Sequence, residues 1–164
     1  MPTRLFLILI SFQVTNPCWG QFTCLDLETE IENHYHEVIY LLKDLLLHIF
    51  QQLKRRCKDQ VDLVCAVYQS PEFLIPGPGK EVRLTFAEGQ ELLRSEGPKK
   101  FCHVRDDEDM STPQEKALGV IVRRKYNSDF YILDKFPESA RPFYVMLDPE
   151  NPSVINAFNY FIRG

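Results

Sequence analysis

The last forty residues of the chain carry the pattern that most restricts its fold, because apolar side chains alternate there with other residues. The alternation runs through Tyr131 and Leu133, then through 143–147, and again through 154–162. A period of two residues is typical of a β-strand that buries one side. Proline-containing stretches separate the three runs, and such stretches favour turns. We therefore predict a three-strand β meander at this end of the chain.

Three other segments predict helices. Over 38–53, leucine and isoleucine recur every three or four residues and give one wide apolar face. Thr85 and Glu88 have the spacing of a capping box, so a helix should begin just after Thr85. Ser111 offers a hydroxyl cap to a further helix with proline in its first turn. With a short strand expected over 81–86, these helices predict an α+β fold.

Several strings in the chain resemble those of one family. Residues 125–164 read KYxxDFYILDKFP, RPFYxMxDPxNP and FxRG, and HYHEV at 34–38 and DMSTPQEKALG at 109–119 agree as well. The chain resembles the cytosolic aspartyl-tRNA synthetases, the class II ligases that charge tRNA with aspartate. The resemblance implies an incomplete class II synthetase antiparallel sheet with packed helices.

The resemblance divides the chain after residue 20. Residues 21–164 correspond to a partial class II aminoacyl-tRNA synthetase catalytic domain, between the family's second and third motifs. Residues 1–20 do not match and are interpreted as a signal-like or non-native leader. Arg4 precedes an apolar run there, and Cys18-Trp19-Gly20 has a spacing that a signal peptidase accepts.

The leader leaves a second interpretation open, in which the chain is a small secreted protein. Cleavage after Gly20 would leave Cys24, Cys57, Cys65 and Cys102, an even number that allows two disulfides in three pairings. A non-native leader instead implies the cytoplasmic location of the family. We expect the chain to be cytoplasmic, with secretion as the alternative.

The family resemblance implies a two-step reaction. Aspartate is first activated with ATP and Mg²⁺, and tRNA is then esterified, so aspartate and tRNA are the implied substrates. Dimerisation with a full-length synthetase is a further interaction that the resemblance suggests. The arginine-bearing loop of the second motif and the third motif are not recognised in this sequence. We therefore expect the chain to be inactive alone and the cofactors not to be retained.

Four positions match substrate-side residues of the family, and none is expected to be catalytic. Gln21 and Phe22 begin a strand expected over 21–28 that resembles the end of the second motif, with Gln21 in place of a usual glutamate. Arg141 belongs to the RPF string, where a structural salt bridge is the other interpretation. Asn159 stands where the family has an acid that holds Mg²⁺. An amide keeps an oxygen ligand but lacks the charge that a hard cation favours, so we expect Asn159 not to function as a ligand.

Charge and hydropathy argue against other classes of function. The formal net charge of −4 gives no basic field of the kind that nucleic-acid-binding domains show. The longest apolar run, 5–10, is too short to span a bilayer, so no membrane partner is expected. The acidic run 105–109 lacks the alternating spacing and glycine turn of a Ca²⁺ loop and is predicted to be a solvated loop.

Overall fold

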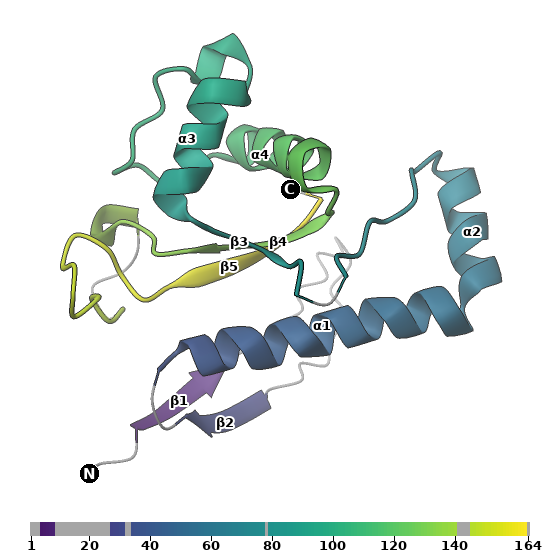
Figure 1. Cartoon of the computed structure of the whole chain (residues 1–164), viewed down its shortest axis with the longest axis horizontal. Coiled ribbons are helices and arrows are strands. Elements are labelled where there is room, and N and C mark those ends of the chain that lie inside the picture. Colours follow the sequence, from purple (N-terminus) through teal and green to yellow (C-terminus); the bar gives the residue numbers. More distant parts are fainter. Residues whose placement is uncertain (1–3, 9–26, 32–33, 78, 141–144, 164) are drawn as a thin grey trace, which may run out of the picture. The chain divides into compact units, whose positions relative to one another are not determined.

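The computed structural model describes residues 4–8, 27–31, 34–77, 79–140 and 145–163. The chain folds as two compact units, Met1–Leu45 and Leu46–Gly164. The elements, in chain order, are β1 (Arg4–Ile8), β2 (Leu27–Ile31), α1 (His36–Arg56), α2 (Lys58–Val67), β3 (Val82–Thr85), α3 (Phe86–Glu96), η1 (Lys99–Phe101), α4 (Thr112–Tyr126), β4 (Phe130–Asp134), η2 (Glu138–Ala140) and β5 (Phe158–Ile162) (Figure 1).

The first unit contains a two-stranded ladder and the beginning of α1. Strands β1 and β2 pair antiparallel, with Arg4 opposite Ile31. Strand β2 overlaps only the end of the strand predicted over 21–28, and the rest of that prediction lies outside the described residues. The domain boundary at residue 20 stays a prediction.

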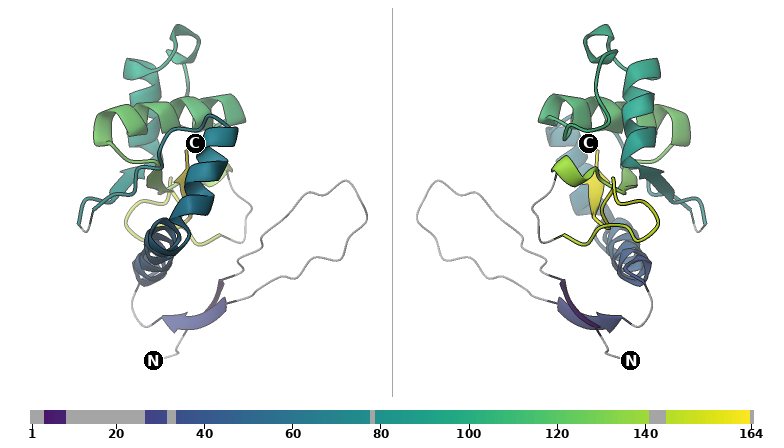
Figure 2. Two further views of the ribbon diagram at one scale, coloured as in Figure 1. Left: turned by 90° about the vertical axis from the view of Figure 1, so that its right-hand side faces the viewer. Right: turned by 90° about the vertical axis from the view of Figure 1, so that its left-hand side faces the viewer.

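The second unit is built on a mixed sheet with the order β3-β4-β5. Strand β4 pairs parallel with β3 and antiparallel with β5. The segment between β3 and β4 contains α3 and α4, which lie together on one side of the sheet (Figures 1 and 2). Parallel neighbours need such a long crossover. The predicted α+β class with packed helices is confirmed, and the described sheet has one parallel and one antiparallel pair.

The predicted three-strand meander is wrong in its middle strand. Its first and third runs correspond to β4 and β5, which are antiparallel neighbours. Of the middle run, Phe143 lies outside the described residues, and Leu147 forms only an isolated bridge with Ile155. Backbone hydrogen bonds of 2.9 Å from Asp148 to Val154 and from Asn156 to Met146 close this segment into a loop. The other edge of β4 is therefore available to β3.

Strand β4 is the centre of this unit, and all five of its residues are buried. Tyr131 and Leu133 belong to the core beneath α3 and α4, together with Leu118 and Val122. The Tyr131 hydroxyl has no hydrogen-bond partner among the described residues, and burial raises its pKa, so it stays neutral.

The opposite face of β4 is also covered. The Phe130 ring stacks on Tyr160 with 5.8 Å between centroids and meets Phe50 of α1 at 6.0 Å. Phe50 in turn contacts Phe73, at 5.1 Å. Both faces of the strand are thus enclosed by aromatic and aliphatic side chains, which is why residues 130–133 are all apolar.

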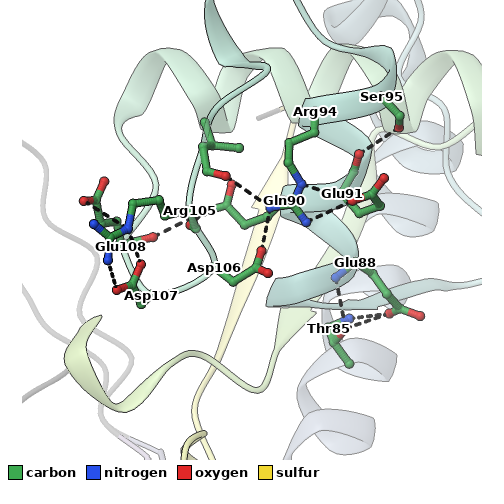
Figure 3. A network of polar contacts seen from close by, with 11 residues as sticks. Thr85, Glu88, Gln90, Glu91, Arg94, Ser95, Arg105, Asp106, Asp107 and Glu108 are labelled. Carbon is green, nitrogen blue, oxygen red and sulfur yellow. Dashed lines mark hydrogen bonds and ion pairs between the residues drawn. The ribbon is translucent and has the colours of Figure 1, made fainter.

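The predicted helix starts are confirmed. The Thr85 hydroxyl accepts from the Glu88 N–H at 3.2 Å, and a Glu88 carboxylate oxygen accepts from the Thr85 N–H at 2.7 Å (Figure 3). Ser111 and Gln114 form the same kind of box at the start of α4. A Cβ on Gly89 would lie 3.0 Å from a Leu133 methyl carbon, so glycine lets α3 approach β4 closely.

The apolar face predicted for the first long helix is covered only in part. Val38 and Leu42 are buried, but Ile49 and Leu53 are 40% and 47% exposed. Leu47, which was not assigned to that face, is buried. Helix α2, which follows, has no buried residue. The end of α1 therefore contacts the sheet through Phe50 rather than through its leucine stripe.

A buried carboxylate at the start of β4 joins segments that are distant in the sequence. Asp129 Oδ2 accepts from the Leu74 N–H at 2.8 Å and from the Arg123 guanidinium, and Arg163 Nε lies 3.5 Å away. The Asp129 carbonyl also accepts from the Arg163 N–H at 2.8 Å. Arg123 Nη2 donates to the Glu72 carbonyl at 3.1 Å. Asp129 therefore fixes loop 71–75, the end of α4 and the end of β5 to one another.

We predict that Asp129→Asn lowers the free energy of unfolding by about 3 kcal/mol. The substitution removes the negative charge that pairs with the arginines, and it replaces one acceptor oxygen by an NH₂ group that can only donate. The matched control is Asp62→Asn, which breaks an exposed pair with Lys58 and should change stability by less than about 0.5 kcal/mol. Urea unfolding followed by circular dichroism measures both. Equal effects of the two substitutions would contradict the role given to Asp129.

Candidate functional site

One of the four predicted substrate-side residues lies in the described part of the chain. Asn159 is half-buried in β5 and stands opposite Leu133 of β4. Gln21, Phe22 and Arg141 lie outside the described residues, so their proposed roles stay predictions.

The register places Asn159 on a defined face of the sheet. Residues opposite one another in neighbouring strands share a face, so Asn159 lies on the side of Leu133. Leu133 belongs to the core beneath α3 and α4, and Phe161, two residues after Asn159, packs against the same core. Asn159 therefore lies on the face of the sheet that α3 and α4 cover, and these helices restrict the access of a ligand to it.

The turn after β4 fixes the segment that leads into β5. Asp134 is 1% exposed, and its carboxylate accepts from the Arg83 guanidinium and, at 2.8 Å, from the Lys135 N–H. Lys135 has a positive φ of 58° and donates from Nζ to Asp148 at 2.7 Å and to Asn156 at 2.8 Å. Its charged side chain thus holds loop 148–156 directly before β5.

A small cavity of about 250 Å³ opens beside this turn. It is lined by apolar side chains and by both acidic and basic groups, namely Phe86, Ala87, Asp106, Asp107, Lys135, Pro137, Ser153 and Val154. Because Lys135 already donates to Asp148 and Asn156, its contribution here is structural. In the described lining, no nucleophile has a hydrogen-bonded base beside it.

A larger cavity of about 560 Å³ lies between the second half of α1, α2 and loop 71–75. Its walls are mostly apolar, with the ion pairs Lys54–Glu72 and Lys58–Asp62 among its lining residues. Asn159 lines neither cavity. Neither of these two cavities therefore places Asn159 beside other reactive groups.

Two arginines, Arg94 and Arg105, form ion pairs with the acidic run 105–109, to which Arg105 itself belongs. Arg94 Nη1 donates to Asp106 at 2.7 Å, and Arg105 Nε donates to Asp107 at 2.8 Å (Figure 3). The buried Gln90 amide holds the loop from below by donating to the Arg105 and Glu108 carbonyls at 3.1 and 3.3 Å. Asp106 to Asp109 are exposed, as predicted for a solvated loop. The part of the chain that the structure describes contains no group of three or more His, Cys, Asp or Glu side chains that could hold a metal ion.

Sequence analysis missed the residues that do most of the positioning. For Asp129, Asp134 and Lys135, which belong to the KYxxDFYILDKFP string, no ion pair was predicted. Their signal was present, because a carboxylate at each end of the apolar run 130–133 is costly to bury unless it is paired. The partners could not be named from the sequence, since Leu74 and Arg83 lie more than fifty positions away.

The secreted two-disulfide alternative gains no support. Cys57, Cys65 and Cys102 are free thiols, and Cys24 lies outside the described residues. Within the described ranges, no helix is long and apolar enough to cross a membrane.

Known proteins show what the chain is similar to. It is 40% identical over 144 residues to the cytoplasmic aspartate–tRNA ligase of Bos taurus, covering 88% of this chain and 28% of that protein. The cytoplasmic aspartate–tRNA ligase 2 of Arabidopsis thaliana is 40% identical over 145 residues, covering 88% and 25%. The chain thus spans between a quarter and a third of the length of these relatives.

A solved structure agrees with the sequence relatives. The aspartyl-tRNA synthetase of Entamoeba histolytica has a TM-score of 0.72 and 35% identity, over 97% of this chain and 32% of that one. The asparaginyl-tRNA synthetase of Pyrococcus horikoshii, at 14% identity and a TM-score of 0.60, shares the fold. The sequence model of the tRNA synthetases class II (D, K and N) matches residues 16–164. Because that match covers nearly the whole chain, the protein belongs to this class II tRNA synthetase family.

Proposed function

We propose that this chain is the central part of the catalytic domain of a cytoplasmic aspartate–tRNA ligase. The observation that carries the proposal is the 40% identity to enzymes of that name over 88% of the chain. Asparaginyl-tRNA synthetases of the same family are only 14–16% identical, which favours aspartate over asparagine as the amino acid.

In such an enzyme a carboxylate oxygen of aspartate would attack the α-phosphorus of ATP, release pyrophosphate and form aspartyl-adenylate. A hydroxyl of tRNA would then attack the activated carbonyl and release AMP. Neither step requires a covalent bond to the protein, so the protein acts through orientation and electrostatics. The described residues fit this role as a scaffold. Asp129 and Lys135 fix the two ends of β4 and thereby the strand β5 that carries Asn159.

Mg²⁺ is the ion that the family reaction implies, and the described residues do not by themselves fit it. Asn159 offers one neutral oxygen on the helix-covered face of the sheet. Hard divalent cations favour charged carboxylates, and the described chain holds no cluster of three acidic, histidine or cysteine ligands. We therefore derive no step through a metal ion at this position.

A chimera tests the proposed function. The 144 matched residues of the bovine ligase would be replaced by those of this chain, and aspartate-dependent pyrophosphate exchange measured. We expect exchange with aspartate and none with asparagine. A folded chimera that is inactive with aspartate would overturn the proposal.

We further propose that the 164-residue polypeptide alone has no exchange activity, since it matches only 28% of the length of the bovine ligase. Exchange with ATP and aspartate should equal the blank, in a sample whose cooperative unfolding shows that it is folded. Sustained turnover above the blank would refute this. The intact bovine ligase is the positive control.

A binding role with a full-length synthetase is a second proposal, favoured by α2. This helix buries none of its residues and leaves Leu63 and Val67 64% and 66% exposed, which is typical of an interaction surface. Size-exclusion chromatography of the polypeptide mixed with full-length bovine ligase should show co-elution that Leu63→Asp with Val67→Asp abolishes. Separate elution of the wild-type polypeptide would count against the proposal.

A further inference from the structure

The C-terminal ends of α3 and α4, together with η1, form a positively charged surface. We call it the α3–α4 basic surface and define it by four exposed cations, Lys99, Lys100, Arg124 and Lys125. Its one described anion is Glu96, whose carboxylate accepts from Arg124 Nη2 at 2.8 Å and from Lys125 Nζ at 2.7 Å. A single carboxylate is therefore shared by two cations.

Lys99 and Lys100 form no ion pair within the described part of the chain, and they follow Glu96 by only three and four positions. Four positive charges face one carboxylate and two helix C-termini, each of which carries about half a negative charge. The surface therefore keeps a net charge of about +2. Hydrogen bonds from Lys125 and then Arg124 lower the pKa of Glu96, so this count already includes an ionised Glu96 at neutral pH.

The negative charges of this region lie elsewhere. In loop 105–109, Asp106 pairs with Arg94 and Asp107 pairs with Arg105 (Figure 3). Two of the four acidic side chains of this loop are thus neutralised by arginines outside the basic surface.

Aromatic rings lie among these cations. Lys125 Nζ is 5.9 Å from the centre of the Tyr126 ring, which is 40% exposed, and Lys100 Nζ is 4.8 Å from that of Phe101. An exposed ring beside lysine and arginine offers a stacking platform for a base next to contacts for the backbone. An acidic peptide would use the cations but not the exposed ring.

We propose that the α3–α4 basic surface binds the phosphate backbone of tRNA, through Lys99, Lys100, Arg124 and Lys125. The choice of RNA over an acidic polypeptide rests on the proposed function and on the exposed Tyr126 ring. Four such contacts give a binding constant that falls about 100-fold between 50 and 200 mM salt. The surface would add to binding by other parts of a ligase without reading sequence.

The test is fluorescence anisotropy of the 164-residue chain with labelled tRNA at several salt concentrations. One variant replaces the four cations of the surface by glutamine. The matched control replaces four exposed cations at the end of α1 and the start of α2, namely Lys54, Arg55, Arg56 and Lys58. Asp59, Asp62 and Glu72 lie near these, so the net charge of that region is about +1. Both variants change the net charge equally, and circular dichroism checks that both stay folded.

We expect the first variant to reduce the slope of log K against log salt by about three, and the control to reduce it by less than one. Glu96→Gln should act in the opposite direction and tighten binding severalfold, because it releases two cations from their shared anion. Equal losses in the two four-residue variants, or weaker binding by Glu96→Gln, would overturn the proposal. So would equal binding of tRNA and polyglutamate, which would identify a surface for acidic polypeptides.

This test is independent of the proposed catalytic function. It measures binding to tRNA without ATP or aspartate, whereas the chimera measures exchange without tRNA. An inactive chimera with surface-dependent tRNA binding would reject only the proposed function. An active chimera with surface-independent binding would reject only the present inference.

Discussion

The structure depends on the complete burial of β4 between two buried carboxylates. Its five residues are enclosed by α3 and α4 on one face and by Phe50 and Tyr160 on the other. An apolar strand alone could shift its register, but the charged pairs at its ends can form in only one alignment. The ion pairs of Asp129 and Asp134 therefore fix the register of β4. This positions β3, β5 and the loops that join them.

The same contacts explain the role of two residues of the matched strings. Lys135 donates to the Asp148 carboxylate, and the Arg163 N–H donates to the Asp129 carbonyl. These charged side chains stabilise internal contacts. In the α3–α4 basic surface, by contrast, two cations share one anion and two have none in the described part of the chain.

Local features were predictable from the sequence and non-local ones were not. The capping boxes at Thr85 and Ser111 depend on residues three positions apart, so their chemistry is visible in the sequence. The alternation at 143–147 was wrongly interpreted as the middle strand of a meander. Alternation indicates an extended segment but does not identify its pairing partner, and β4 pairs with the distant β3 instead. Net charge likewise gives only a total of −4, which does not reveal that Lys99, Lys100, Arg124 and Lys125 lie together on one surface.

Native-state hydrogen exchange of the 164-residue chain tests most directly whether β4 is the organising element. Amides of β4 should exchange only through global unfolding and be the slowest in the chain. Amides of α2 should exchange orders of magnitude faster, because that helix buries no side chain. If β4 amides exchanged as fast as those of α2, β4 would not be the element on which the rest of the fold depends.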